Sequence, residues 1–261
     1  MVAWSPLRFN CGREIANRFV IAPMTTDASH EDGTAAEDEI EFVRRRSASG
    51  FGATISSATY VKQDGRSWQG IGAAHDGHLS SLRRLAEAMR VAGGLAILQI
   101  YDGGRIAKPE LIGEQFLRAP SAVASLRPGA KTPRAMTADG VEGLIASFRD
   151  AASLARKAVF DGVEIHGANH YAVHQFFSPR ANHRVDKWGG TLAKRMNFPL
   201  AVAQAVRDDP SVKNKLRVYA IGSWNTANDR AARDYLFREH ADLWWIESDT
   251  TFRGMYVGGD Q

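Results

Sequence analysis

Short apolar runs rich in β-branched residues alternate along the chain with longer stretches in which apolar residues recur at helical spacing. The short runs predict strands at residues 18–24, 53–61, 95–101 and 162–166. The longer stretches predict helices at about residues 36–50, 79–92, 138–158 and 191–207, each followed by a Gly, Asp or Pro signal that stops it. This alternation is typical of repeated βα units around a parallel sheet that is covered on both faces.

The last part of the chain is poorer in such units. Only two further strands are predicted, at residues 216–222 and 242–246, with a helix at about 226–239 between them. Residues 102–137, with four prolines, form a long excursion after the third strand. The total is six strands, whereas a (β/α)8 barrel of about 250 residues has eight. We therefore expect one α/β domain over residues 1–261, a TIM-type (β/α)8 barrel that is incomplete or modified. An open sheet, a distorted barrel and completion by a second chain all satisfy the pattern.

Composition and charge exclude several classes of protein. No run of about 18 apolar residues occurs, and the N-terminus lacks a signal-peptide pattern, so neither membrane spanning nor export is expected. A single cysteine, Cys11, rules out an internal disulfide and a Cys-rich metal site, which fits a cytoplasmic protein without a structural metal. The net charge is +4, but Lys and Arg are scattered among 29 acidic residues, so no nucleic-acid partner is expected.

A group of candidate catalytic residues follows the fourth predicted strand, where a parallel strand delivers side chains to the active face. His166 ends this strand, and Asn169 and Tyr171 lie in the turn beyond it. His166 and Asn169 can aim two neutral donors at one carbonyl oxygen and stabilise the enolate that forms when hydride arrives, while Tyr171 protonates the neighbouring carbon. In the alternative interpretation His166 caps the strand and Tyr171 packs in the core.

The segment around these residues resembles a known family. Residues 162–190 read GVEIHGANHYAVHQFFSPRANHRVDKWGG, which is similar to the hallmark stretch of the old yellow enzyme family, and the similarity extends from about Leu7 to Arg207. The resemblance implies an FMN-dependent oxidoreductase that passes hydride from NAD(P)H through the flavin to a small-molecule substrate, an activated alkene or related acceptor. It also implies catalytic roles for His166, Asn169 and Tyr171.

The resemblance further implies residues that would contact the flavin ring. Pro23, Met24 and Thr25 match the first-strand motif, and Ala58 matches a small residue whose backbone approaches the ring. Gln99 matches the partner of the flavin amide. A glutamine inside a strand of Leu and Ile would leave its amide unpaired unless a polar group faces it, and a flavin edge is such a group; a backbone partner in a neighbouring loop is the alternative. Arg105, in the sequence YDGGR, is similar to a residue that lines the substrate pocket, although Asp102 stands where the family has His.

The region after residue 207 departs most from the family. Gly222 and Ser223 resemble the turn after strand seven that holds the flavin phosphate, with the chain shortened by two βα units, but Glu247 and Ser248 stand where Gly-Arg is expected. In a second alignment, residues 216–218 belong to strand five and Arg217 lies beside the flavin. We divide the chain accordingly into a family-like part, residues 1–207, and a divergent part, residues 208–261.

The sequence is also compatible with two other functions. The missing units and Glu247 would suit a degenerate barrel with weak or no FMN binding that acts as a small-molecule binding protein or as part of an assembly. A flavin-free barrel enzyme for a sugar phosphate would use the turn at Gly222 but would leave His166, Asn169 and Gln99 without a role. An exposed parallel edge would also invite association into a homo-oligomer.

Overall fold

The computed structural model describes every residue except 1, 10–12, 211–216, 223–243 and 248–261. Its centre is a parallel sheet in the order β3-β4-β6-β9-β10-β11, with β5 also paired to β6. The strands are β3 Val20–Ile21, β4 Ala53–Ile55, β5 Thr59–Tyr60, β6 Leu95–Tyr101, β9 Gly162–Gly167, β10 Arg217–Gly222 and β11 Trp244–Glu247. Among the described strands, β3 and β11 do not pair with each other. Within the described residues the sheet is therefore open, which is one of the forms expected of an incomplete barrel.

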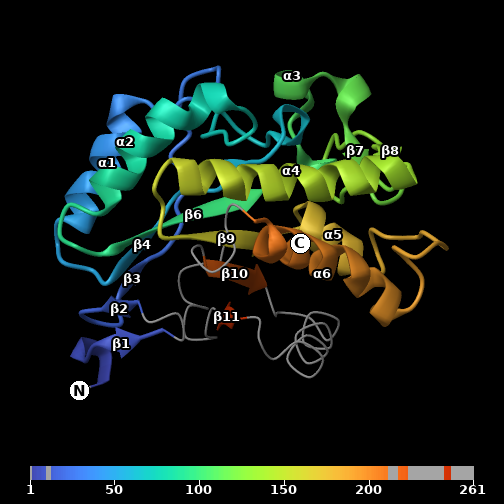
Figure 1. Cartoon of the computed structure of the whole chain (residues 1–261). Helices are drawn as coiled ribbons and strands as arrows, with labels where there is room; N and C mark the ends of the chain where they lie inside the picture. The colour runs from blue at the N-terminus through green and yellow to red at the C-terminus, as the bar shows by residue number, and fades with distance from the viewer. Residues whose placement is uncertain (1, 10–12, 211–216, 223–243, 248–261) are drawn as a thin grey trace.

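Four long helices cover the outer face of this sheet (Figure 1). They are α1 Glu37–Ser47, α2 Leu79–Met89, α4 Ala138–Lys157 and α6 Leu192–Asp208, and they confirm the helices predicted up to residue 207. Helix α4 packs on both β6 and β9, and α6 packs on β10. Between these helices and the sheet lies the main hydrophobic core, whose fully buried side chains include Leu98, Phe148 and Phe198.

A short N-terminal hairpin that the sequence pattern did not predict covers the other face of the sheet. Strands β1 Leu7–Arg8 and β2 Glu14–Ile15 pair antiparallel. Ile15 joins a buried cluster with Ile55 and Ile97, and Leu7 packs against that cluster. The hairpin thus shields the inward-facing apolar residues of β4 and β6 from water.

Two predicted strands are shorter than the sequence pattern suggested. The strand expected over residues 18–24 is reduced to β3, and the strand expected over residues 53–61 is divided into β4 and β5. In the gap, Ser56 donates its hydroxyl to the carbonyl of Ser57 at 2.8 Å, and Ser57 donates its own to Glu39 at 2.5 Å. These side-chain hydrogen bonds compete with the strand ladder and explain the break. The predictions for β6 and β9 are confirmed.

The excursion after β6 carries short elements of its own. They are the 3-10 turns η4 Gly104–Ile106 and η5 Glu114–Phe116, the short helix α3 Pro109–Ile112, and the parallel pair β7 Arg118–Ala119 and β8 Arg134–Ala135. Earlier in the chain lie the 3-10 turns η1 Val2–Trp4, η2 Gln63–Gly65 and η3 Asp76–His78. A further helix, α5 Ala172–Phe177, follows β9 directly and was not predicted.

Strand β10 occupies the fifth position of the sheet, directly beside β9. The two strands pair in register from Arg217 with Gly162 to Gly222 with Gly167. With two βα units missing, both alignments of the sequence place this strand beside β9, so the order does not choose between them. The predicted helix at residues 226–239 and the residues Ser223 and Ser248 lie outside the described part of the chain.

Candidate active site

The candidate site lies at the carboxyl edge of the sheet, where β5, β6 and β9 end. Tyr60 pairs in register with Tyr101 at the ends of β5 and β6, and Gln99 pairs with Glu164 between β6 and β9. Parallel strands in register bring their carboxyl ends to one edge, and loops after such ends commonly carry binding and catalytic residues. We therefore expect the binding and catalytic residues of the protein at this edge.

His166 stands at this edge as a neutral hydrogen-bond donor. Its side chain is buried, and the backbone N–H of Ala168 donates to its Nδ1 at 3.2 Å. Because Nδ1 accepts a hydrogen bond in the neutral ring, the proton belongs on Nε2. Burial lowers the pKa of His166 to about 3, so the ring stays neutral near pH 7. Nε2–H is then a donor without charge.

Asn169 lies in a tight turn between β9 and α5. Both Asn169 and His170 have positive φ angles, 55° and 60°, and both are exposed. Asn tolerates this region better than most residues, and such conformations gather at functional sites. Gln175 braces the turn by donating its Nε2 to the carbonyl oxygen of His170 at 2.5 Å. The turn therefore presents Asn169 to the solvent side of the edge.

The structure brings Tyr171 and His166 together. Their rings meet edge to face with centroids 4.8 Å apart. Tyr171 also contacts Tyr101 at 5.0 Å, and Trp68 stacks on Tyr101 at 4.6 Å with only 2° between the ring planes. These four residues form an aromatic wall along the edge of β6 and β9.

Two members of the aromatic wall were not predicted from the sequence. Tyr101 ends an apolar strand, and its position two residues after Gln99 was the signal that could have marked it, since alternate residues of a strand share a face. Trp68 comes from the loop after β5, where no periodic pattern exists.

Gln99 has a partner that was not predicted. Its Nε2 donates to Oε1 of Glu164 at 2.6 Å, and both side chains are buried. The partner is therefore a carboxyl on the neighbouring strand rather than a loop backbone group. Burial raises the pKa of Glu164 to about 7, and the hydrogen bond from Gln99 opposes that rise.

The first-strand residues lie just beyond β3, at the same edge of the sheet. Met24 keeps 41% of its surface exposed, Thr25 is exposed and Pro23 is half-buried. Ala58 is buried and lies in the gap between β4 and β5. An exposed methionine beside polar groups provides apolar surface that a flat ligand could cover.

Arg105 forms hydrogen bonds to the backbone of the excursion. Its Nη1 donates to the carbonyl oxygens of Val123 at 3.3 Å and Ala124 at 3.2 Å. Asp102, three residues earlier, is fully buried and accepts from Nη2 of Arg118 at 2.7 Å. Burial raises the pKa of Asp102, and the guanidinium of Arg118 opposes that rise. This pair joins the end of β6 to β7.

The candidate phosphate residues are only partly placed. Gly222 ends β10 opposite Gly167, at the same edge as His166. Arg217 begins β10 opposite Gly162, and five strand residues at about 3.3 Å each put its Cα roughly 16 Å from that edge. The structure does not bring the backbone of Arg217 to the carboxyl edge, and Ser223 lies outside the described residues.

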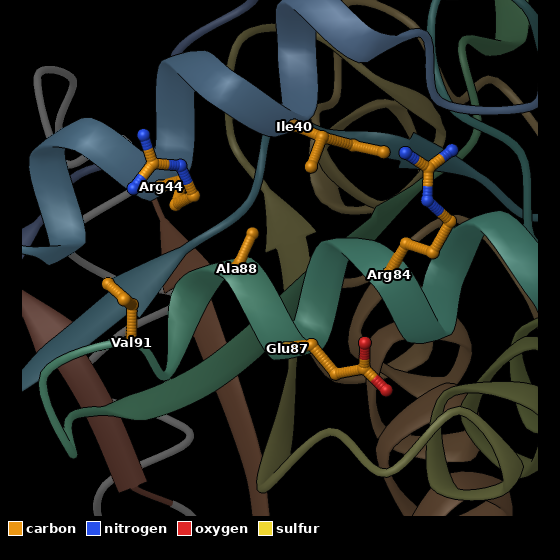
Figure 2. A pocket seen from close by; sticks show the side chains of 6 residues that line it. All are labelled: Ile40, Arg44, Arg84, Glu87, Ala88 and Val91. Carbon is orange, nitrogen blue, oxygen red and sulfur yellow. The ribbon is translucent and has the colours of Figure 1, made fainter.

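A surface depression of about 300 Å³ lies elsewhere, between α1 and α2 (Figure 2). It is lined by Ile40, Arg44, Arg84, Glu87, Ala88 and Val91, all outside the carboxyl edge. Within the described residues, no group of three or more His, Cys, Asp or Glu could hold a metal ion. The same part of the chain contains no helix that is long and apolar enough to cross a membrane.

Comparison with known proteins assigns the chain to a family. The model of the NADH:flavin oxidoreductase / NADH oxidase family matches residues 4–231. The chain belongs to this family. Old yellow enzymes are among its members, and the family uses FMN with NAD(P)H as the reductant.

Individual relatives agree with this assignment. The chain is 45% identical over 198 residues to an NADH:fumarate oxidoreductase of Klebsiella pneumoniae, which covers 76% of this chain and 21% of the relative. It is 36% identical over 196 residues to an NADPH dehydrogenase of Bacillus velezensis, covering 74% and 56% of the two chains. The old yellow enzyme from Pichia sp. superposes with a TM-score of 0.81 at 25% identity, covering 92% of this chain and 67% of the other. The chain thus spans about a fifth of the first relative and about half of the second.

Proposed function

We propose that the protein is an FMN-dependent oxidoreductase that passes hydride from NAD(P)H to an activated alkene or a related electrophilic acceptor. The observation that carries this proposal is the neutral Nε2–H donor of His166 at the carboxyl edge, in ring contact with Tyr171. A donor that stays uncharged near pH 7 can stabilise negative charge developing on a carbonyl oxygen without giving up its proton. When bound, FMN would supply the hydride transfer between NAD(P)H and the acceptor.

The residues at the edge suit the ring of this cofactor. Met24 offers exposed apolar surface, and Gln99 contributes a buried amide. Two buried polar atoms beside them, Oγ1 of Thr26 and Oε2 of Glu164, have no hydrogen-bond partner within the described part of the chain. Buried polar atoms are normally paired, so a ring with polar edges would satisfy them. In this proposal Pro23, Met24, Thr25, Ala58 and Gln99 hold the ring, and Gly222 and Ser223 hold the phosphate.

The acceptor would be held and activated by the residues beyond β9. His166 and Asn169 donate hydrogen bonds to its carbonyl oxygen, and Tyr171 donates a proton to the carbon next to the one that receives hydride. The stack of Trp68 on Tyr101 provides a flat apolar wall that orients a planar acceptor and excludes water. Arg105 would border this pocket from the excursion.

We also propose a cytoplasmic location, because Cys11 is the single cysteine of the sequence. A homo-oligomer is proposed because β3 and β11, among the described strands, each have one neighbour in the sheet. Sedimentation of the purified protein tests the second proposal, and a monomer at every concentration would refute it.

The oxidation of NAD(P)H in the presence of FMN and cyclohexenone tests the function. The proposal expects NAD(P)H consumption that depends on the acceptor and exceeds the rate with free FMN alone. A rate equal to that of free FMN would reject the proposal and leave the small-molecule binding protein as the better description.

A further inference from the structure

Glu164 and Gln99 form a buried side-chain pair in the middle of two adjacent strands. They are in register across β9 and β6, and Nε2 of Gln99 donates to Oε1 of Glu164 at 2.6 Å. Glu164 has 0% of its surface exposed and Gln99 has 3%. The second carboxyl oxygen, Oε2 of Glu164, has no hydrogen-bond partner within the described part of the chain. Burying a carboxyl with one oxygen unpaired costs free energy, so we expect this carboxyl to have a function beyond packing.

The pair determines which way the amide of Gln99 faces. A glutamine amide has a donor end and an acceptor end of nearly equal size, so either end can face a ligand unless a neighbour selects one. Glu164 accepts from the NH2 end. The carbonyl oxygen and the second N–H of Gln99 then keep fixed directions. A cofactor at this edge meets one defined pattern of acceptor and donor rather than two.

We propose that Glu164 is a positioning residue, which fixes the amide of Gln99 and thereby sets the hydrogen-bonding pattern offered to the flavin ring. This inference rests on the proposed function, because it assumes that FMN is the ligand at this edge. Glu164 itself would not act on the acceptor. It would act through Gln99, and through its own charge when it loses its proton.

The surroundings of Glu164 make its charge state responsive to pH. Burial raises its pKa to about 7. The group that faces it from β6 is Gln99, which is uncharged, and His166 on its own strand is neutral. Its neighbours Val163 and Ile165 belong to the core beneath the helices, so Glu164 lies on the opposite face of the sheet. The residue in register with Glu164 on β10 is Tyr219. Strand β10 also carries a cation, Arg217, two residues before Tyr219.

A double-mutant cycle on FMN affinity tests the positioning role. The variants are Glu164→Leu, Gln99→Leu and the double variant, and the measurement is the FMN dissociation constant by fluorescence titration. Losing one buried hydrogen bond should weaken FMN binding about tenfold in each single variant. If Glu164 acts through Gln99, the double variant should be no weaker than the worse single variant. Fully additive effects would overturn the proposal.

The matched control is Thr54→Val. Thr54 is also buried in a central strand, β4, but its hydroxyl pairs with Ser47 at 2.8 Å, away from Gln99. This variant should bind FMN like the parent chain. Urea unfolding of each variant shows which of them fold.

A conservative variant provides an independent arm if Glu164→Leu does not fold. Glu164→Gln keeps an oxygen that can accept from Gln99 but never carries a charge. Because a carboxylate opposes the addition of electrons nearby, the reduction potential of FMN bound to the parent should fall below that of Glu164→Gln as the pH rises through about 7. Identical potentials in the two proteins at every pH would overturn the proposal.

These outcomes separate the inference from the proposed function. If the parent chain binds no FMN, both are rejected. If the parent binds FMN and turns over NAD(P)H while the cycle is additive and the potentials coincide, only the role of Glu164 is rejected.

Discussion

The backbone N–H of Ala168 donates to Nδ1 of His166 at 3.2 Å. Ala168 lies two residues after His166 in the chain. This local contact fixes the tautomer of the imidazole and leaves Nε2–H as the donor. Burial keeps the pKa of His166 at about 3, so the same form persists across the neutral range. A turn of the backbone has thus prepared the side chain for hydrogen bonding to an acceptor before any acceptor binds.

Replacing His166 by Ala should lower kcat/KM for an enone acceptor by about 100-fold to 1,000-fold, the usual effect of removing one donor to a developing oxyanion. The FMN dissociation constant should change little, because His166 belongs to the acceptor side of the site. The control is His30→Ala, at an exposed position in the segment between β3 and α1. Unchanged kcat/KM in His166→Ala would show that another group polarises the acceptor.

The contribution of Glu164 to the stability of the fold should fall between about pH 4.5 and pH 7. Its folded-state pKa of about 7 lies above the ordinary value of 4.5, so the folded chain holds the proton more tightly than the unfolded chain. The contribution is fully present below pH 4.5 and is lost as the pH rises through about 7, to an extent on the order of 3 kcal/mol. Urea unfolding across this range should show the free energy of unfolding of the parent falling relative to that of Glu164→Gln. Parallel pH profiles for the two proteins would contradict the assignment.

Arg118→Met should destabilise the fold by about 3 kcal/mol, because it leaves the buried carboxyl of Asp102 without its cation. The matched control is Arg149→Met, which removes an exposed partner of Asp150 and should cost less than about 0.5 kcal/mol. The free energy of unfolding in urea measures both. Equal losses in the two variants would mean that the Asp102 pair does not stabilise the excursion.

Gly65→Ala should destabilise the chain by about 1–3 kcal/mol, since an added Cβ would overlap Oδ2 of Asp102. Gly143→Ala, at an exposed position of α4 with no atom within 4 Å of the new Cβ, should instead stabilise by about 0.5–1 kcal/mol. Thermal unfolding should therefore move in opposite directions for the two substitutions. A stabilised Gly65→Ala would show that the loop after β5 can move away from Asp102.

Hydrophobic periodicity was sufficient to predict β6, β9 and the four long helices. These elements bury one face or both faces, so the spacing of their apolar residues shows which positions are buried. The elements that it missed are held by other forces. Helix α5 has six residues, all buried, and therefore shows no polar face. The break between β4 and β5 depends on serine hydroxyls, which no apolar pattern reveals.

The candidate site likewise contains residues that the sequence predicted and residues that only the structure reveals. His166 and Tyr171 were predicted because they follow a strand in a recognised motif, and the structure brings their rings together. Trp68 reaches the site from a distant loop, and Glu164 reads as an ordinary strand residue until its register with Gln99 is known. Contacts across strands depend on register, and the apolar run of one strand does not show which residue of the next strand lies opposite. Arg217 begins β10 rather than ending it, and its role beside the flavin stays a prediction.

The absorbance spectrum of the purified chain, recorded before and after addition of FMN and removal of the unbound excess, tests the central claim most directly. We predict a yellow protein whose flavin band, near about 450 nm, remains after dialysis and is bleached by NAD(P)H. A colourless protein that retains no such band after incubation with FMN would contradict the proposed function.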